Sequence, residues 1–109
     1  MPRASLVVPY VCQGLELGLR AHKVVMVEGI PYCLLRGYEQ FVSEAMIPDT
    51  RIYEAQCIIP NFTQVRRKDC KSKGPRCHTC IFDGPCEGPW REYPDRYGWQ
   101  EFVPITRKI

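Results

Sequence analysis

The sequence predicts an α/β protein with an irregular, cysteine-rich, metal-binding extension, and two observations lead to this fold class. Near the N-terminus a helical pattern is followed by an apolar run typical of a buried strand, which is the order found in parallel α/β folds. From residue 74 onward no long periodic element follows, and residues 74–109 hold five of the ten prolines, three of the seven cysteines and both tryptophans. We therefore expect a helix–strand–helix unit over 1–50, a connector of one strand and a basic helix over 51–73, and the cysteine-rich segment over 74–109.

Residues 4–21 are predicted to form an amphipathic helix. Apolar side chains recur there at three- and four-residue steps and form one stripe, made of Val8, Val11, Cys12, Leu15 and Leu19. Cys12 belongs to this stripe, so we expect a buried, chemically inert thiol. Pro9 is expected in the first turn, where its missing N–H costs little.

The next segment is predicted to be a strand buried on both faces, because residues 24–27 are a continuous apolar run rich in valine. Gly29 and Pro31 end this strand, and Cys33 follows directly. In α/β folds, sites are built just beyond the C-terminal ends of the strands. Cys33 is therefore a candidate site residue despite its isolation in the sequence.

Three further elements complete the predicted order. Residues 38–45 have the apolar spacing of a second amphipathic helix, with one face made of Tyr38, Phe41, Val42 and Ala45. Residues 51–59 alternate like a half-buried strand, with one side made of Tyr53, Ala55, Cys57 and Ile59. Asn61 to Gln64 resembles a capping box that opens a short basic helix ending near Gly74. Its cations are expected to form a solvated face, and they are Arg66, Arg67, Lys68, Lys71, Lys73 and Arg76.

Cys77, Cys80 and Cys86 form the strongest chemical signal in the chain. They lie within ten residues, among glycines and prolines that allow tight turns. Thiolates are the natural ligands of zinc and of iron–sulfur clusters, and a Cys-x2-Cys spacing directs two sulfurs toward one site. Three ligands are thus local, and a fourth has to come from elsewhere in the chain.

The candidates for the fourth ligand are Cys33, Cys57, Cys70 and His78. His78 lies inside the Cys77–Cys80 turn and is expected to point outward, whereas Cys70 is on the polar helix and within reach. Cys57 is on the apolar face of the predicted strand, where a buried structural thiol is the more common role. Zinc knuckles usually present two close ligand pairs, and the absence of a second pair favours iron–sulfur.

Composition restricts the class of protein. The seven cysteines are an odd number, which argues against a secreted disulfide scaffold and for a reducing, cytoplasmic compartment. The net charge of +3 is too small to indicate a nucleic-acid partner. No run approaches the ~20 apolar residues of a membrane helix. The aromatic residues near the C-terminus, Trp90, Tyr93, Tyr97, Trp99 and Phe102, are expected to cover a metal site against water.

Two blocks of the sequence, read together, resemble the C-terminal part of radical S-adenosylmethionine proteins that end in an auxiliary iron–sulfur (SPASM- or twitch-like) segment. The blocks are VEGIPYCLLRGYEQFVSE at 27–44 and CHTCIFDGPCEGPWREYPDRYGWQEFVPI at 77–105. The resemblance implies the last helix and strand of a parallel, TIM-type barrel, followed by a [4Fe–4S]-binding extension. It also implies that Cys77, Cys80 and Cys86 are cluster ligands and that Cys33, in the IPYC position, is the fourth.

One departure from that family sets the expected activity. The Cys-x3-Cys-x2-Cys motif that binds the S-adenosylmethionine-cleaving cluster does not occur in the sequence. We therefore expect a cluster-binding part that is not catalytically competent alone, with S-adenosylmethionine used only in a complete parent enzyme. The missing barrel portion, as a separate chain, is the expected partner. The alternative is a small zinc-binding module whose basic helix contacts RNA or a protein.

Overall fold

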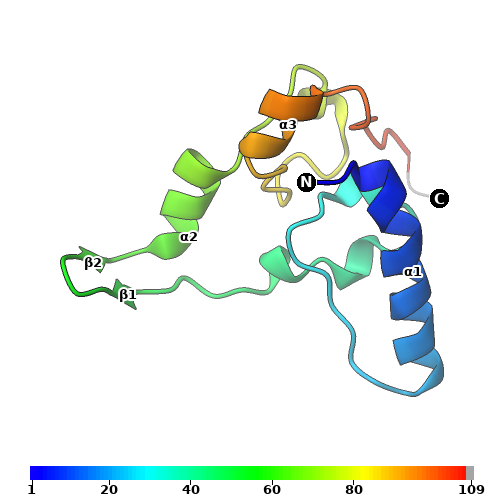
Figure 1. Ribbon diagram of the computed structural model, residues 1–109, viewed down its shortest axis with the longest axis horizontal. Coiled ribbons are helices and arrows are strands. Elements are labelled where there is room, and N and C mark those ends of the chain that lie inside the picture. The colour runs from blue at the N-terminus through cyan, green and yellow to red at the C-terminus, as the bar shows by residue number, and fades with distance from the viewer. Residues whose placement is uncertain (108–109) are drawn as a thin grey trace.

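The computed structural model describes residues 1–107 and shows a chain in which an arm projects from a more compact body (Figure 1). The body contains the long N-terminal helix and the cysteine-rich segment, and the arm contains a small hairpin and a short helix. The elements are α1 (Ala4–Arg20), β1 (Ile52–Tyr53), β2 (Ile58–Ile59), α2 (Phe62–Val65) and α3 (Glu92–Tyr97).

The helix predicted over 4–21 is confirmed as α1. Leu15 is buried, and Val8, Val11 and Cys12 pack against the core around it, as the apolar stripe requires. Pro9 lies in the second turn of α1 rather than in the first, because the helix already begins at Ala4. Leu19, at the end of the stripe, is exposed.

The prediction of a strand buried on both faces at residues 24–27 is wrong. Val24 is 87% exposed and Met26 is 54% exposed, whereas Val27 is buried and forms a parallel bridge with Val42. The segment is extended, but α1 covers it on one side. Gly18 allows this close approach, because a Cβ at that position would lie 2.3 Å from Cγ1 of Val25.

The helix predicted over 38–45 is also wrong. Two short 3₁₀ turns, η2 (Glu39–Phe41) and η3 (Ser43–Ala45), stand there instead. Val42 separates them in an extended conformation. Its neighbours Phe41 and Ser43 exchange backbone hydrogen bonds with Val27 at 2.7 and 2.9 Å. Tertiary pairing has therefore overridden the helical spacing of this segment.

Residues 51–59 form an antiparallel hairpin rather than one strand. Ile52 pairs with Ile59, and the turn between β1 and β2 contains Cys57. The N-cap half of the predicted capping box is confirmed, since the Asn61 side chain accepts a hydrogen bond from the Gln64 N–H at 3.2 Å. The helix then continues as a π-helical turn, η4 (Arg66–Cys70), and ends before Gly74.

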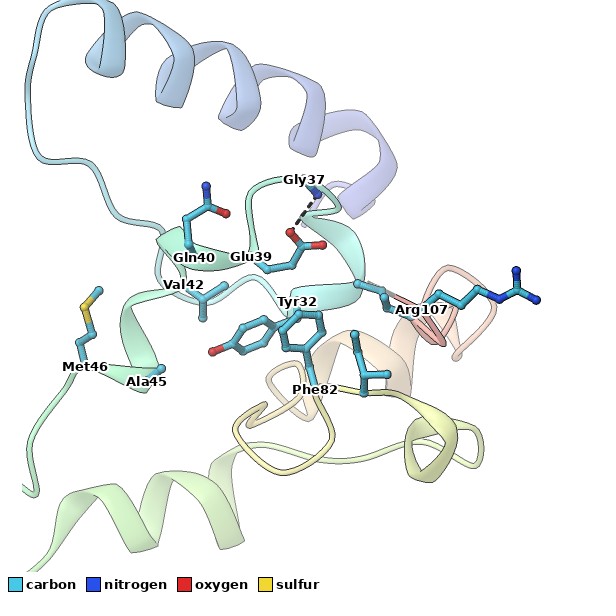
Figure 2. Close-up of a pocket in the computed structure, with 11 residues that line it drawn as sticks. Tyr32, Gly37, Glu39, Gln40, Val42, Ala45, Met46, Phe82 and Arg107 are labelled. Carbon is cyan, nitrogen blue, oxygen red and sulfur yellow. Dashed lines mark hydrogen bonds between the residues drawn. The ribbon is translucent and has the colours of Figure 1, made fainter. Parts of the chain in front are cut away.

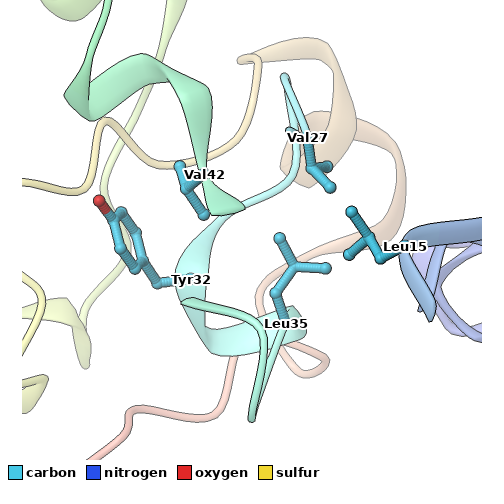
Figure 3. Close-up of a cluster of buried hydrophobic side chains, with 5 residues drawn as sticks. All are labelled: Leu15, Val27, Tyr32, Leu35 and Val42. Atoms are coloured by element: carbon cyan, nitrogen blue, oxygen red, sulfur yellow. The ribbon is translucent and has the colours of Figure 1, made fainter. Parts of the chain in front are cut away.

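The core lies beside the 3₁₀ turn that carries Cys33, η1 (Tyr32–Leu34). Figure 3 shows its side chains converging from α1, from the extended segment and from the turns that follow; they are Leu15, Val27, Tyr32, Leu35 and Val42. Leu35 is fully buried. Because Tyr32 and Leu35 are fixed in this core, the backbone at Cys33 is fixed as well. The origin of the body as part of a parallel barrel stays a prediction.

Candidate metal centre

The structure brings four thiols from two separate segments of the chain around one small cavity. Cys33, Cys77, Cys80 and Cys86 all line a cavity of about 30 Å³. Three of them come from the loop that follows η4, and the fourth comes from η1, some forty residues earlier in the chain. These are the four residues that the sequence and the family resemblance single out.

Local turns place the three clustered cysteines. Cys77 begins the 3₁₀ turn η5 (Cys77–Thr79), and the Cys80 N–H donates to the Cys77 carbonyl at 3.0 Å. The chain then turns again, and the Cys86 N–H donates to the Phe82 carbonyl at 2.9 Å. These two successive turns direct all three side chains to the same side of the loop.

Prolines and aromatic rings make the remaining walls of the cavity. The wall residues are Pro31, Tyr32, Gly88, Pro89, Trp99, Phe102 and Pro104. Trp99 and Phe102 pack together with ring centroids 5.3 Å apart. Of the five aromatic residues predicted to cover the site, these two line the cavity, whereas Trp90, Tyr93 and Tyr97 do not. Lys71 Nζ lies over the Trp90 ring instead.

Two backbone amides point at the sulfurs. The Gly74 N–H donates to Cys77 Sγ at 3.2 Å, and the Gly88 N–H donates to Cys86 Sγ at 3.3 Å. Hydrogen bonds of this kind stabilise the charged form of an acceptor, and at iron–sulfur sites they help to set the reduction potential. Both therefore suit sulfurs that serve as thiolate ligands.

Cys33 is a half-buried thiol in the first of the two segments that form the site. Burial, followed by the negative charge of Cys86, Cys80 and Cys77, raises the pKa of Cys33 to about 12. The metal-free chain therefore keeps this thiol protonated at neutral pH. A metal that binds Cys33 has to displace its proton, as metals do at protonated thiol ligands generally.

The other cysteines lie away from the cavity. Cys12 packs against the core, as predicted. Cys57 is exposed in the hairpin turn, so the prediction that it is a buried thiol is wrong. The Cys70 backbone carbonyl accepts a hydrogen bond from Arg91, but its side chain does not line the cavity. His78 is exposed, as its place in the turn predicts.

Within residues 1–107, no three cysteine, histidine, aspartate or glutamate side chains are arranged so that they could already hold a single metal ion. The four thiols thus surround a cavity without converging on one point. A zinc ion with Zn–S bonds of about 2.3 Å brings its sulfurs to roughly 3.8 Å from one another. A cluster keeps them farther apart because each thiolate binds a different iron. The donor set fits either group chemically.

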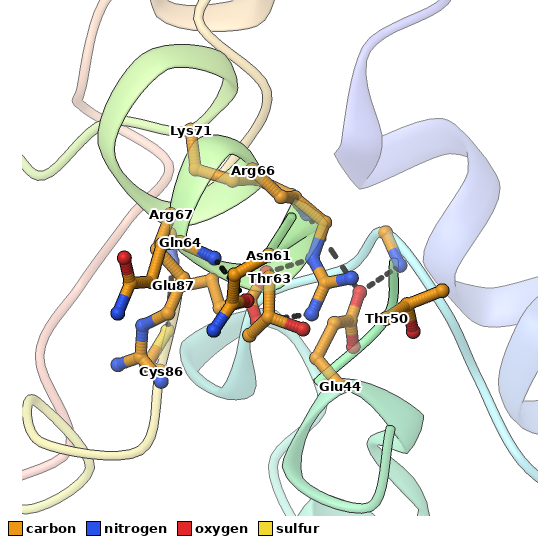
Figure 4. A network of polar contacts seen from close by, with 12 residues as sticks. Glu44, Thr50, Asn61, Thr63, Gln64, Arg66, Arg67, Lys71, Cys86 and Glu87 are labelled. Atoms are coloured by element: carbon orange, nitrogen blue, oxygen red, sulfur yellow. Dashed lines mark hydrogen bonds and ion pairs between the residues drawn. The ribbon is translucent and has the colours of Figure 1, made fainter. Parts of the chain in front are cut away.

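Sequence reasoning missed a buried set of charges behind the cysteine loop (Figure 4). Arg66 donates two hydrogen bonds to the Glu87 carboxylate, at 2.7 and 2.8 Å, and both side chains are buried. Lys71 Nζ lies 3.7 Å from Glu44 Oε1, and both of these side chains are also buried. The solvated face predicted for Arg66 and Lys71 is therefore wrong. The position of Glu87 directly after Cys86, a predicted ligand, was the one available signal.

Most of the other cations of the basic run also contact the protein itself. Arg67 donates to the Gly84 carbonyl at 3.0 Å, and Lys73 contacts the Asp83 carboxylate at 2.9 Å. Arg76 donates to the backbone carbonyl of Phe102 at 3.4 Å. Arg67 and Lys73 thus bind the stretch that links Cys80 to Cys86, whereas Arg66 binds Glu87, directly after Cys86.

Tyr32 also lines a larger, open groove of about 600 Å³ (Figure 2). Tyr32 and Phe82 stack in it with ring centroids 4.7 Å apart. The Tyr32 ring is thus shared between the groove and the cysteine-lined cavity. Because Tyr32 precedes Cys33 and Phe82 lies between Cys80 and Cys86, this stack connects both parts of the cysteine site.

Comparison with known proteins leaves the site to be interpreted from its own geometry. No protein-family model matches the chain, and no curated protein or solved structure matches it significantly. None of the helices in residues 1–107 combines the length and apolar character that a membrane span requires.

Proposed function

We propose that the chain binds an iron–sulfur cluster of the [4Fe–4S] type through Cys33, Cys77, Cys80 and Cys86. The observation that carries this proposal is the cavity that all four thiols line. Four cysteines are the usual ligand set of such a cluster. In this proposal the chain is the C-terminal, auxiliary-cluster part of a radical S-adenosylmethionine protein, as the sequence resemblance implies.

The surroundings of the cavity support a cluster. Two amide N–H groups donate to sulfurs, and aromatic and proline side chains keep water from the walls. A bound cluster supplies one-electron transfer, a point of attachment for substrate, or a brace for the fold. The chain's own residues hold the four thiolates and cover them.

The proposal excludes radical generation by this chain alone. Reductive cleavage of S-adenosylmethionine needs the Cys-x3-Cys-x2-Cys motif, which the sequence lacks. That reaction belongs to a complete parent enzyme. A separate chain that supplies the remaining barrel is the partner that this interpretation implies.

Zinc is the alternative occupant of the same four thiols, but the basic run gives little support to RNA binding. Arg66 and Lys71 are buried, and Arg67, Lys73 and Arg76 donate to carboxylate or carbonyl oxygens of the chain itself. These cations are therefore already engaged within the protein. The cluster interpretation makes the better use of this segment.

The test is metal analysis with a visible absorption spectrum, on protein purified without oxygen and reconstituted with iron and sulfide. We expect broad absorption near ~400 nm and about four irons per chain. Serine variants of Cys33, Cys77, Cys80 and Cys86 should each lose it. Cys57→Ser and Cys70→Ser are matched controls and should keep it. One tightly held zinc without a chromophore would instead identify a zinc module.

A further inference from the structure

We propose that Arg66 is a positioning residue of the metal centre: through the buried carboxylate of Glu87 it holds Cys86 in place for the metal. This inference rests on the proposed function, but it assigns a role to two residues that do not line the cavity. Arg66 and Glu87 lie 21 positions apart in the sequence. Its basis is the geometry of the Arg66–Glu87 pair and of the backbone on either side of Cys86.

The first part of the argument is the quality of the pair. Arg66 Nε and the Arg66 NH2 nitrogen each donate to a different oxygen of Glu87, so the contact is bidentate. The two side chains are 5% and 2% exposed. The hydrogen bonds to Glu87 raise the pKa of the Arg66 guanidinium further, so its charge is permanent. A bidentate contact fixes direction as well as distance, which a single lysine contact does not do.

The second part is what the pair holds. Glu87 directly follows Cys86, and the next residue, Gly88, donates its N–H to Cys86 Sγ. The residue after Gly88 is held as well, because the Pro89 carbonyl accepts a hydrogen bond from the Ser72 N–H at 3.0 Å. Of the three residues that follow Cys86, Glu87 and Pro89 are thus held by other segments of the chain, and Gly88 between them donates to the Cys86 sulfur itself. Arg66 is the side chain that supplies the tie at the first of them.

The third part is the burial of the Arg66–Glu87 pair, which distinguishes it from the other charged side-chain contacts that residues 1–107 make with this loop. Lys73 and Arg67 also reach residues 83–87, but these contacts are exposed to solvent. Exposed pairs contribute little to geometry or stability. By contrast, a buried carboxylate that loses its partner has to move, or take up a proton, to escape an uncompensated charge. Loss of Arg66 should therefore displace the backbone next to Cys86.

The experiment compares Arg66→Met, Arg66→Lys, Glu87→Gln and the double variant R66M/E87Q with the wild-type chain. Lys73→Met is the matched control, because it removes a cation that contacts the same loop from outside. Each protein is titrated with Co²⁺, whose sulfur-to-metal absorption reports the number of bound thiolates, and is also reconstituted with iron and sulfide. Circular dichroism and the urea midpoint report folding separately.

We expect Arg66→Met to weaken Co²⁺ binding by about 10- to 100-fold, the range typical of residues that orient a metal ligand. Its cobalt spectrum should show one thiolate fewer, and its reconstituted cluster should lose one iron preferentially. Arg66→Lys should restore the spectrum in part, and Lys73→Met should match the wild type. The double variant leaves no unpaired buried charge, so it should fold while its spectrum stays altered.

Three outcomes would overturn the inference. In the first, Arg66→Met binds Co²⁺ with wild-type affinity and spectrum. In the second, only its folded fraction falls and the spectrum of the bound metal is unchanged, which would mean a purely structural role. In the third, the double variant has the wild-type spectrum. A wild-type chain that binds neither Co²⁺ nor iron would refute the proposed function itself, and this inference with it.

Discussion

Replacing Gly88 with alanine tests whether the backbone beside Cys86 is as constrained as the structure shows. Gly88 has φ of +79°, in the left-handed region that side chains other than glycine disfavour. A Cβ at this position would lie 1.9 Å from the carbonyl oxygen of Ser72, and ordinary contact begins at 3.4 Å. The two backbones would have to separate by about 1.5 Å, the difference between these distances.

The expected loss of stability follows from these two effects. An L-residue in the left-handed region costs roughly 1–2 kcal/mol. Forcing an extra carbon into a packed site typically costs about 1–3 kcal/mol more. Gly88→Ala should therefore lower the free energy of unfolding by about 2–5 kcal/mol. Because the Gly88 N–H donates to Cys86 Sγ, the same displacement should also reduce metal loading.

The assay is urea unfolding of the metal-free chain under anaerobic, reducing conditions, together with the iron content after reconstitution. Gly84→Ala is the matched control in the same loop, since a Cβ there meets nothing within 4 Å. That variant should be unchanged or slightly more stable, by about 0.4–1 kcal/mol, because alanine restricts the unfolded chain. Equal urea midpoints and equal iron contents for the two variants would refute the reasoning.

Three further predictions concern the core, the Cys33 thiol and the outer face of α1. Leu35→Ala should lower the free energy of unfolding by about 2–5 kcal/mol, because Leu35 is fully buried; a urea midpoint close to that of the wild type would contradict this. The raised pKa of Cys33 means that folding favours its protonated thiol. Cys33 therefore adds to the free energy of unfolding of the metal-free chain. This addition is fully present when the pH is below 9.0, the ordinary pKa of a cysteine thiol, and it is lost as the pH rises toward about 12, the pKa of Cys33 in the folded chain. Unfolding free energies measured across this range should show a loss that Cys33→Ser removes. The exposed side chains Leu6, Tyr10 and Leu17 lie on the face of α1 opposite its core stripe, so the isolated chain should self-associate in sedimentation measurements. Leu6→Ser with Leu17→Ser should reduce the association, and a strictly monomeric wild-type chain would count against the barrel interpretation.

The parts of the fold that the sequence could predict are those with strong local signals. The apolar stripe of α1 is long and regular, and the Asn61 cap has a side-chain acceptor at the required spacing. Residues 24–27 lack such a signal, because an apolar run does not reveal which of its faces another element covers. At residues 38–45 the helical spacing is real, but the pairing of Val27 with Val42 decides the conformation.

In the candidate site, too, the residues that the sequence could predict are those with a local signal. The spacing of Cys77, Cys80 and Cys86 placed three thiols together, since short turns act over a few residues. Cys33 was found through its position after the extended segment and through the family resemblance, although that segment is not the two-sided strand expected. The Arg66–Glu87 pair joins residues 21 positions apart and follows no periodic pattern. Nothing local in the sequence distinguishes Arg66 from its exposed neighbours in the basic run.

The way in which the candidate site is built bears on how a bound metal and the fold would depend on each other. The walls of the cavity come from 3₁₀ turns and extended loops, and regular helices and strands contribute little to them. Buried ion pairs such as Arg66–Glu87 add little net stability, because taking charges out of water offsets most of their attraction. What they add is a fixed direction for the backbone that they hold. The thiols, once bound to a metal, would then supply free energy that this part of the chain lacks by itself. We therefore infer that the ion pairs select the geometry of the site, whereas a bound metal would stabilise it.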